Sequence, residues 1–471
     1  MKAELGIIGM GVMGKSLSRN FSRKGVRLAL YNRRVPKSEE NIAEKHSKAF
    51  PELRDATGFE DLELFVKSLE QPRKILMMLP AGTATEETIG MLSELLSPGD
   101  VLVDGGNAHF EDTNRRVEAL KKKALLFLGM GISGGEKGAL EGPSLMAGGD
   151  PKAYEVMEPF LLKIAAVNTE EKICCTYVGP EGSGHFVKMV HNGIEYAEMQ
   201  LIAETYGFLR DALQYDNNRI ADCFESWCEG DSDSYLLQIS TQILRKKESG
   251  ASLLEKIVDV AHHKGTGLWS VTTANELGVP VTLMQGALYA RQCSTLKEQR
   301  STFFDLYNIK YVKTYISKKT LKRAYDASRI VNLHQGFEFL QTASEKWNWN
   351  LSLEQIAQLW TAGCIIKSKL MEQVGSVLME SNSLLTHPLV VKQMQQNTKD
   401  LRKLMVSSIE AGVALPCFSA AWTFFQSIVQ QKTTANMIQA QRDFFGTHGY
   451  ERTDAPKGIL HHTEWTKGNS T

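Results

Sequence analysis

The feature that most constrains the fold is a glycine-rich loop close to the start of the chain. Gly9, Gly11 and Gly14 follow the apolar run Leu5–Ile8 and precede a helical pattern. In a strand–loop–helix unit, this spacing allows a tight turn, close approach of a pyrophosphate to the backbone, and close packing of helix on strand. The helix N-terminus also offers partial positive charge to phosphates. The loop therefore predicts a dinucleotide site that is formed by Gly9, Met10, Gly11, Val12, Met13 and Gly14.

Short apolar runs alternate with helical patterns over the first part of the chain. These runs are apolar almost throughout, as in strands that are covered on both faces: 5–8, 26–31, 74–78, 101–104 and 125–128. The alternation predicts an α/β domain of the Rossmann type with a parallel, doubly wound sheet. After residue 182 helical periodicity dominates to about residue 440, which predicts a large all-α domain.

These patterns divide the chain into three parts. We expect a dinucleotide-binding domain over residues 1–181, an all-helical domain over 182–438 and a polar C-terminal tail over 439–471. The helical part contains a weak internal repeat, because Trp227 and Trp360 each begin a Trp-x-x-Gly motif that is followed by a serine and a leucine. The repeat indicates either a duplicated helical unit or a chance match.

Charge and cysteine content limit the function classes. The 54 basic residues balance the 54 acidic ones, so the whole-chain charge gives no argument for binding nucleic acid or a membrane surface. No uninterrupted apolar run is long enough for a membrane span. The seven cysteines lack the spacing of a zinc or redox motif. We therefore expect a cytoplasmic protein with reduced thiols and no metal site.

The end of the second predicted strand bears on the choice of coenzyme. NAD sites usually place Asp or Glu there, where it binds the ribose 2′-hydroxyl. This chain has Asn32, Arg33 and Arg34 instead. Because no carboxylate is expected to repel a 2′-phosphate and two guanidinium groups are available to hold one, the sequence favours NADP. The alternative is a solvated basic turn.

The most informative polar pattern lies in the helical segment that follows residue 182. Lys188, His191, Asn192, Glu195 and Tyr196 occupy positions i, i+3, i+4, i+7 and i+8, so they share one helix face. The opposite face is apolar, and a polar stripe on a buried helix needs a partner such as a substrate. A solvent-facing stripe is the alternative. Lys188 and Glu195 are about 10 Å apart along the axis, which suits a sugar-sized ligand. A glycine within this helix, Gly193, has no structural purpose that the sequence reveals.

Three further segments add polar groups. Asn107 ends the motif Asp-Gly-Gly-Asn at the end of a strand. The stretch 131–136 offers the Ser133 hydroxyl and clustered backbone N–H groups that could form an anion-binding nest. Lys264 and Thr266 pair a cation with a hydroxyl, and Arg291 lies downstream. Together these segments predict a pocket for an anionic, polyhydroxylated ligand.

These motifs resemble those of the 6-phosphogluconate dehydrogenase family over almost the whole chain. The matching stretches are GMGVMG at 9–14, DGGN at 104–107, GISGGEKGALEGPSLMAGG at 131–149, HFVKMVHNGIEYAEMQLIAE at 185–204, KGTG at 264–267 and QAQRDFFGTHGYER at 439–452. The resemblance implies NADP-dependent oxidative decarboxylation of 6-phosphogluconate to ribulose 5-phosphate in the pentose phosphate pathway. It implies Lys188 as the base and Glu195 as the acid. It also implies a homodimer in which each tail reaches into the partner.

The resemblance further implies which residues contact the ligands. The substrate would contact Asn107, Ser133, Gly134, Gly135, His191, Asn192, Tyr196, Lys264, Thr266 and Arg291, with Arg442 and His448 supplied by the partner's tail. The coenzyme would contact the glycine loop, Asn32, Arg33, Arg34 and Asn107. The chain departs from the family pattern at Pro80, Ala108 and His262–His263, and at Arg34. The departures near the coenzyme bear on its affinity more than on its identity, and none of the departures falls on a proposed catalytic residue.

Two other functions are compatible with parts of the sequence. The β-hydroxyacid dehydrogenases, exemplified by 3-hydroxyisobutyrate dehydrogenase, resemble this chain in the glycine loop and the catalytic lysine. They are typically much shorter and lack the KGTG and tail motifs. An NADP-binding protein without turnover is the alternative from another class, and the presence of both Lys188 and Glu195 argues against it.

Overall fold

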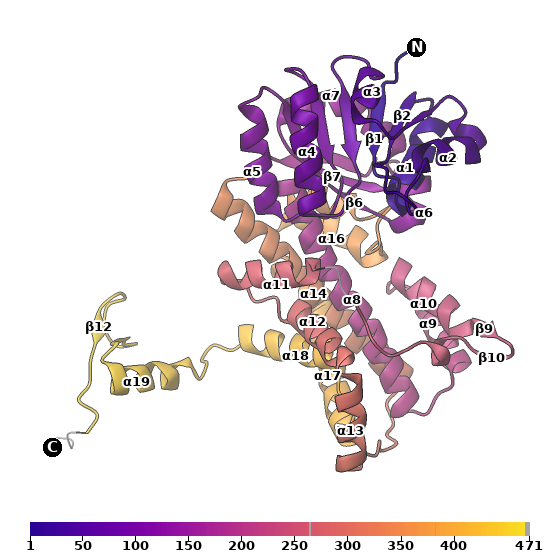
Figure 1. Cartoon of the computed structure of the whole chain (residues 1–471). Coiled ribbons are helices and arrows are strands. Elements are labelled where there is room, and N and C mark those ends of the chain that lie inside the picture. The colour runs from indigo at the N-terminus through magenta and orange to yellow at the C-terminus, as the bar shows by residue number, and fades with distance from the viewer. Residues whose placement is uncertain (263–264, 382, 467–471) are drawn as a thin grey trace. The chain divides into compact units, whose positions relative to one another are not determined.

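An eight-stranded sheet forms the centre of the N-terminal part of the chain in the computed structural model, which describes residues 1–262, 265–381 and 383–466 (Figure 1). The strand order is β3-β2-β1-β4-β5-β6-β7-β8, and its first six members have the order of a Rossmann-type domain, as predicted. The strands are β1 (Leu5–Ile8), β2 (Leu28–Tyr31), β3 (Thr57–Phe59), β4 (Lys74–Met77), β5 (Val101–Asp104), β6 (Leu126–Ser133), β7 (Ser144–Gly149) and β8 (Cys175–Gly179).

The sheet departs from the predicted all-parallel arrangement at one pair. β6 and β7 are antiparallel, whereas β7 and β8 are parallel to each other. The link 134–143 between β6 and β7 is shorter than the dozen or so residues that a parallel crossover needs. The strand predicted over residues 125–128 is longer in the structure. β6 begins at Leu126 and continues through the glycine-rich stretch to Ser133.

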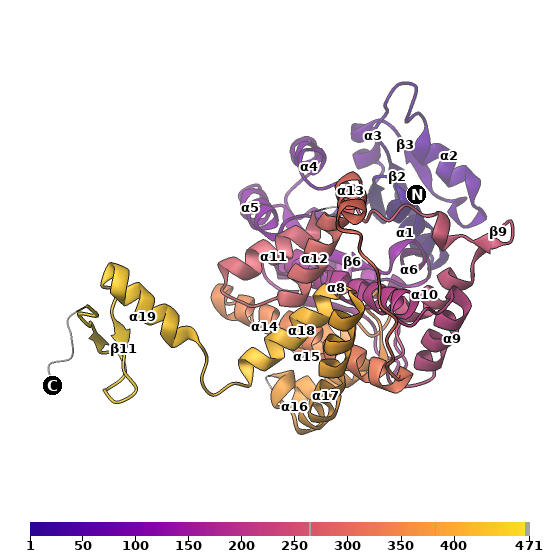
Figure 2. The same ribbon diagram turned by 90° about the horizontal axis from the view of Figure 1, so that it is seen from below.

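Helices cover both faces of the sheet, and each face has its own hydrophobic core (Figure 2). One face carries α1 (Val12–Arg23), α2 (Ile42–Ala49), α6 (Gly135–Glu141) and α7 (Pro151–Ile164). The other carries α3 (Leu62–Lys67), α4 (Thr83–Leu95) and α5 (Phe110–Lys121). β1, β2, β4 and β5 are buried along their whole length, which explains why their sequences are apolar almost throughout.

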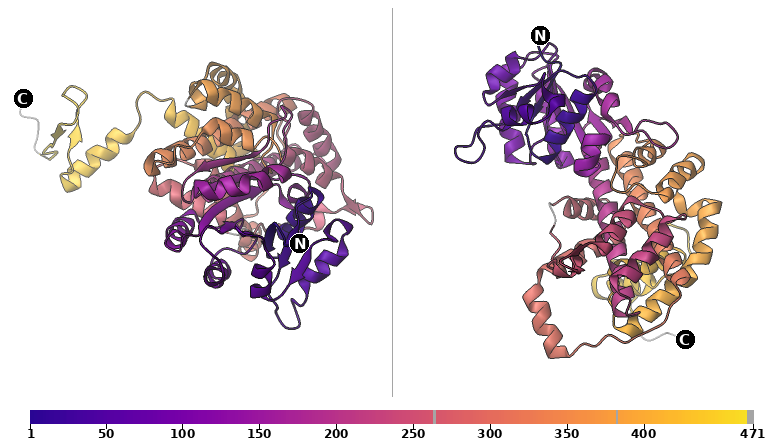
Figure 3. Two further views of the ribbon diagram at one scale, coloured as in Figure 1. Left: turned by 90° about the horizontal axis from the view of Figure 1, so that it is seen from above. Right: turned by 90° about the vertical axis from the view of Figure 1, so that its right-hand side faces the viewer.

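The part of the chain after β8 is mostly helical, as predicted. Its longest helices are α8 (Ser183–Asp211) and α14 (Lys318–Trp347), which pack against each other. Figure 3 shows the sheet-containing part and the helical part as two neighbouring lobes of the larger of two compact units, Met1–Ala421. The remaining helices that begin in this unit are α9 (Asn217–Cys228), α10 (Tyr235–Arg245), α11 (Thr266–Glu276), α12 (Thr282–Thr295), α13 (Lys297–Tyr307), α15 (Leu353–Leu359), α16 (Lys369–Glu380), α17 (Pro388–Ala411) and α18 (Pro416–Ile428). No helix in the described ranges combines the length and the apolar character that crossing a membrane requires.

The weak internal repeat corresponds to two similar pairs of helices. Ser234 caps α10 and Ser368 caps α16, in each case by accepting a hydrogen bond from the backbone N–H three residues later. The two serines also form an isolated β-bridge with each other. Because α9–α10 follows the long helix α8 and α15–α16 follows the long helix α14, the arrangement supports a duplicated helical unit over a chance match.

The C-terminal unit, Trp422–Thr471, is described up to residue 466. It contains α19 (Ala435–Gly446) and the antiparallel pair β11 (Tyr450–Glu451) and β12 (Leu460–His461). The buried Asp443 carboxylate pairs with His462 and accepts hydrogen bonds from Gly449 N–H and Trp465 Nε1–H. Burial opposes ionisation of Asp443, but these donors outweigh it and hold the pKa well below its usual range. Asp443 therefore ties the helix to the β-hairpin.

Candidate active site

The glycine loop has the geometry that a bound pyrophosphate requires. Gly9 has a φ of +94°, and a Cβ there would lie 2.5 Å from the carbonyl oxygen of Met78. A Cβ on Gly14 would collide with the carbonyl oxygen of Gly9, so α1 packs closely on the loop. By contrast, a Cβ on Gly11 would meet no protein atom within 4 Å. Gly11 therefore leaves open the space that a phosphate group would approach.

A cavity of about 540 Å³ lies beside this loop, at the carboxyl ends of β1, β2, β4 and β5. Ligands bind at this edge of open α/β sheets. Its lining includes all of the predicted coenzyme residues except Arg34: Gly9, Met10, Gly11, Val12, Met13, Gly14, Asn32, Arg33 and Asn107. Arg34 instead forms an ion pair of 3.3 Å with Glu40. The cavity is also lined by Leu79 and Pro80, the latter of which is a departure from the family pattern.

The expectation that no carboxylate lies near the end of β2 is wrong. Glu39 lines the cavity, and its Oε2 accepts a hydrogen bond of 3.0 Å from Asn32 Nδ2. The backbones of Val35 and Glu39 exchange two hydrogen bonds of 2.8 Å, which closes a tight turn and returns the chain to Asn32. The sequence argument considers only the residues directly at the end of the strand. It misses Glu39, which lies seven residues after Asn32.

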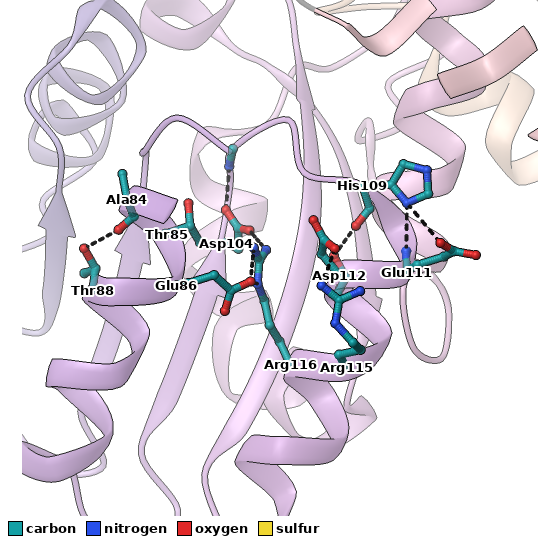
Figure 4. A network of polar contacts seen from close by, with 12 residues as sticks. Ala84, Thr85, Glu86, Thr88, Asp104, His109, Glu111, Asp112, Arg115 and Arg116 are labelled. Atoms are coloured by element: carbon teal, nitrogen blue, oxygen red, sulfur yellow. Dashed lines mark hydrogen bonds and ion pairs between the residues drawn. The ribbon is translucent and has the colours of Figure 1, made fainter. Parts of the chain in front are cut away.

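The loop that carries Asn107 rests on a buried ion-pair network (Figure 4). The Asp104 carboxylate at the end of β5 accepts a hydrogen bond of 2.9 Å from Gly106 N–H and one of 2.8 Å from Arg116. Arg116 on α5 also forms a 2.8 Å ion pair with Glu86 on α4. Because Asp104 and Arg116 are almost fully buried, these contacts hold the loop rigidly while Asn107 stays exposed.

The start of α8 lies unusually close to strands β6 and β7. A Cβ on Gly131 of β6 would lie 2.5 Å from the Cβ of Lys188. A Cβ on Gly184 of α8 would lie 2.5 Å from Gly148 N, on β7. Gly131, expected to contribute to an anion nest, is therefore a strand residue, and Gly129 and Gly131 together let α8 approach the sheet. This approach sets Lys188 beside Gly131, two residues before Ser133 at the end of β6.

The predicted polar face of α8 forms a compact cluster around His191. Lys188 Nζ lies 3.2 Å from His191 Nδ1, and Glu195 Oε2 lies 3.6 Å from the same atom. Asn192 Oδ1 lies 3.2 Å from His191 Nδ1, and Ser133 Oγ lies 3.0 Å from His191 Nε2. The side chains of Lys188 and Glu195 thus converge on His191, although the two residues are about 10 Å apart along the helix axis, as predicted. A solvent-facing stripe is wrong, because every residue from Ser183 to Ile194 is buried.

Burial shifts the titration of this cluster toward uncharged groups. Burial lowers the pKa of Lys188, although the Glu195 charge opposes the shift. Burial raises the pKa of Glu195, opposed by Lys188 and Arg291. The pKa of His191 lies well below its ordinary value because of burial and the nearby Lys188. A neutral amine and a protonated carboxyl group are therefore favoured on one helix face, as a paired base and acid require.

Cys364 joins this cluster and was not among the residues predicted from the sequence. Its Sγ lies 2.9 Å from His191 Nε2. Burial raises the pKa of Cys364 to about 12, so it stays a neutral thiol. The residue follows the second Trp-x-x-Gly motif at 360–363, which is the nearest sequence signal, but nothing in that motif indicates a contact with α8.

A second group of predicted residues meets near the middle of α8. Arg291 on α12 stacks over the ring of Tyr196, with its guanidinium carbon 3.7 Å from the ring centroid. Thr266 is the buried first residue of α11, and a Cβ on the neighbouring Gly267 would lie 2.5 Å from the Tyr196 ring. Tyr196, Thr266 and Arg291 therefore lie together, as predicted. The predicted residue Lys264, like His263, lies outside the described residues.

The structure supplies a purpose for Gly193. A Cβ at this position would lie 2.6 Å from Met284 Sδ on α12 and 3.2 Å from Ser270 Oγ on α11. Gly193 therefore allows α11 and α12 to pack closely against α8, which is a structural role that the sequence did not reveal. The cost of a glycine within a helix is offset by this contact.

The remaining predicted residues lie elsewhere in the structure. Gly134 and Gly135, with φ of +110° and +61°, lie at the start of α6. Arg442 and His448 are exposed residues of the C-terminal unit, where Arg442 donates a hydrogen bond to Gln439. Across the residues that the structure describes, no three His, Cys, Asp or Glu side chains are grouped so that they could hold a metal ion.

Comparison with known families places both parts of the chain. The family model described as the NAD binding domain of 6-phosphogluconate dehydrogenase matches residues 4–179. The model described as the 6-phosphogluconate dehydrogenase C-terminal domain matches residues 184–465. The boundary between the two matches falls in the short connection between β8 and α8.

Comparison with individual proteins agrees over the full length. A Haemophilus ducreyi protein named 6-phosphogluconate dehydrogenase, decarboxylating, is 40% identical and covers 100% of this chain and 98% of its own. A Bacillus subtilis relative named as the NAD(+)-dependent, decarboxylating enzyme is also 40% identical, over 98% of this chain and 99% of its own. The solved structure of Plasmodium falciparum 6-phosphogluconate dehydrogenase has a TM-score of 0.92 at 35% identity and covers 98% of this chain and 100% of that one. The chain therefore belongs to the 6-phosphogluconate dehydrogenase family.

Proposed function

We propose that this chain converts 6-phospho-D-gluconate to D-ribulose 5-phosphate and CO2, with reduction of NADP to NADPH. The observation that carries the proposal is the convergence on His191 of a lysine and a glutamate whose neutral forms are both favoured by burial. The relatives support it, because the Haemophilus ducreyi protein is named as the decarboxylating enzyme. The Plasmodium falciparum enzyme was solved in complex with NADP+ and with 6-phosphogluconate.

The coenzyme fits the cavity beside the glycine loop. The open space at Gly11 and the N-terminus of α1 would receive the pyrophosphate. Arg33 lines the cavity, and we propose that its guanidinium holds the 2′-phosphate of NADP, whereas Arg34 is paired with Glu40 and is not part of the lining. When bound, the nicotinamide supplies a hydride acceptor. The coenzyme type is thus a nicotinamide dinucleotide, and NADP is our proposal for its identity.

Lys188 is the proposed base. Its neutral amine takes the proton of the substrate 3-hydroxyl while the hydrogen on C3 departs as hydride. The product is a β-keto acid, so its carboxylate can leave as CO2 and the bond electrons can pass to the ketone oxygen. Protonated Lys188 then donates a hydrogen bond to that oxygen and stabilises its developing negative charge.

Glu195 is the proposed acid. The raised pKa keeps its carboxyl group protonated at a higher pH than an exposed glutamate allows. It donates this proton to C1 of the enediol that decarboxylation leaves, which yields ribulose 5-phosphate. His191 lies between the base and the acid and contacts Ser133, so it would orient the hydroxyl groups of the substrate.

The remaining substrate contacts fall into two groups. We propose that Tyr196, Lys264, Thr266 and Arg291 hold the 6-phosphate, together with Arg442 of the partner. We propose that the carboxylate and hydroxyl groups meet Asn107, Ser133, Gly134, Gly135, His191 and Asn192, and that His448 of the partner's tail completes the site. The stacking of Arg291 on Tyr196 supports the first group, because it fixes a guanidinium group over one of the residues in that group.

A direct assay tests the proposed reaction. Purified protein is mixed with 6-phosphogluconate and with NADP or NAD in parallel cells, and absorbance at the NADPH band is followed with CO2 release. We expect NADPH and CO2 in equal amounts. Reduction of coenzyme without CO2, or turnover of 3-hydroxyisobutyrate instead, would contradict the proposal and favour a β-hydroxyacid dehydrogenase.

We propose that the active form is a homodimer whose tails exchange between subunits. This proposal places Arg442 and Lys188 of one complete site on different chains. Mixing a Lys188→Met chain with an Arg442→Ala chain, followed by unfolding and refolding together, should therefore restore activity at one site of each mixed dimer. Tails that serve their own subunit predict no restoration. Sedimentation of the separate variants verifies that both still form dimers.

We also propose domain boundaries at 181/182 and 438/439, and a cytoplasmic location. The first boundary is supported by the end of β8 at Gly179 and the start of α8 at Ser183. Seven free cysteines, five of them buried, support a reducing compartment. Limited proteolysis of the folded protein, with the cut sites identified by mass spectrometry, checks the boundaries.

A further inference from the structure

The loop after β2 returns a carboxylate to the place where β2 ends. Two backbone hydrogen bonds between Val35 and Glu39 close the turn, and Glu39 Oε2 then lies 3.0 Å from Asn32 Nδ2. In Rossmann-type domains the residue at the end of this strand is usually the carboxylate that binds the ribose 2′-hydroxyl of NAD. Asn32 occupies that position here, but Glu39 supplies from the loop the carboxylate that Asn32 lacks.

Asn32 has no hydrogen left with which to bind a ribose. Its Oδ1 accepts a hydrogen bond of 3.0 Å from Met10 N–H. Its amide nitrogen donates to the carbonyl oxygen of Arg33 and to Glu39, each at 3.0 Å. A primary amide has two N–H donors, so both are used. Asn32 therefore offers no donor to a 2′-phosphate, and the carboxylate of Glu39 beside it can accept a hydrogen bond from a ligand hydroxyl.

The positive charge at this end of the cavity is smaller than the sequence suggests. The Arg34 guanidinium donates to Glu40 and holds the pKa of that carboxyl group below its usual range. Within the described part of the chain, the guanidinium of Arg33 makes no hydrogen bond or ion pair, and Arg33 is the one arginine that lines the cavity. At the end of β2, the charged groups that line the cavity are thus one unpaired guanidinium, that of Arg33, and one carboxylate, that of Glu39.

We propose that Glu39 is the specificity-determining residue that limits the preference of this chain for NADP over NAD. Its carboxylate repels the 2′-phosphate that Arg33 attracts, and it accepts a hydrogen bond from the 2′-hydroxyl when that phosphate is absent. The inference rests on the proposed function, because it takes the cavity to hold the adenosine end of the coenzyme. It follows that the chain binds both coenzymes, with only a modest preference for NADP.

Binding of two small nucleotides tests this directly and does not depend on turnover. Isothermal titration calorimetry gives the Kd of adenosine 2′,5′-bisphosphate and of 5′-AMP for the wild type and for Glu39→Gln. Glutamine removes the charge but keeps an acceptor for Asn32. We expect Glu39→Gln to bind the bisphosphate about tenfold more tightly, with 5′-AMP binding unchanged or weaker.

Glu44→Gln is the matched control, since it makes the same charge change in the same region. Glu44 lies exposed on α2, bonds to Lys48 and does not line the cavity. For each variant, the Kd of adenosine 2′,5′-bisphosphate is divided by the Kd of 5′-AMP. If this ratio is the same in Glu39→Gln and in Glu44→Gln, the inference is overturned.

An Arg33→Met variant separates this inference from the proposed function. Loss of bisphosphate binding in Arg33→Met, together with an unchanged ratio in Glu39→Gln, keeps the NADP site and removes Glu39 from its specificity. Failure of the wild type to bind either nucleotide contradicts the coenzyme site itself, and the role of Glu39 with it.

Discussion

The coenzyme cavity and the cluster around His191 differ in the kinds of residue that form them and in how deeply those residues are buried. The cavity is lined by the glycine loop and by apolar side chains, and its charged residues Arg33, Glu39 and Glu87 are at least partly exposed. The cluster is formed by titratable side chains that are buried and lie within 3.6 Å of one imidazole. From this difference we expect the first region to supply coenzyme affinity and the second region to supply proton transfer. Substitutions in the two regions should therefore change different quantities.

The largest effect is expected from Glu195→Gln, which keeps the size of the side chain but removes its proton. The rate of ribulose 5-phosphate formation should fall by about 10² to 10⁴-fold, because protonation of C1 loses its acid. The Kd of NADP should not change. Product analysis and coenzyme titration measure the two quantities. An altered NADP affinity with normal turnover would break the distinction between the two regions.

The next effect concerns the close approach of α8 to the sheet. Gly184→Ala should destabilise the protein by roughly 1–3 kcal/mol or more, because the new methyl group meets the backbone at Gly129 and Gly148. Turnover should also fall as Lys188 shifts. Gly207→Ala lies on the same helix, meets no atom within 4 Å, and should stabilise by roughly 0.5–1 kcal/mol. Denaturant titration of both variants measures this, and equal stabilities would contradict the close packing.

An effect on stability of similar size, with no effect on turnover, is expected at Glu204, a buried carboxyl group of α8. Burial raises its pKa from 4.5 to about 7, although the N–H groups of Cys417 and Phe418 oppose the shift. The folded state therefore holds a proton that the unfolded state releases, so this group contributes most below pH 4.5 and its contribution is lost as the pH rises to about 7.

Glu204→Gln removes this titration. Between pH 4.5 and 7, the stability of the wild type relative to the variant should fall by up to about 3 kcal/mol. Turnover at a fixed pH should not change, which distinguishes Glu204 from Glu195 on the same helix. Unfolding free energies measured across this range test the prediction. Parallel pH profiles of the two proteins would show that Glu204 does not titrate as described.

The smallest effect is expected from Gly11→Ala in the coenzyme loop. The added methyl group meets no protein atom within 4 Å, so stability should not change. It occupies the space expected for the pyrophosphate, so the Kd of NADP should rise about tenfold while kcat at saturating coenzyme stays the same. Fluorescence titration with NADPH measures the affinity. Lower stability with unchanged affinity would show that this space belongs to the protein core.

The two regions also differ in how well the sequence predicts them. Residues 9–14 and the polar face of α8 were predicted because each is a local pattern, fixed by a loop or by helical periodicity. Glu39 and Cys364 were missed because a turn and a distant segment bring them to their sites. The purpose of Gly193 and the antiparallel β7 also depend on packing and on a short connection, which periodicity does not record.

The role of Lys188 as the base is tested most directly by measuring turnover of the Lys188→Met variant with saturating 6-phosphogluconate and NADP. Methionine keeps much of the apolar stem of lysine but cannot accept a proton. The Kd of NADP should match the wild type, whereas NADPH and CO2 formation should both fall to the limit of detection. Turnover close to that of the wild type, in a variant that binds NADP normally, would contradict the role of Lys188 as the base.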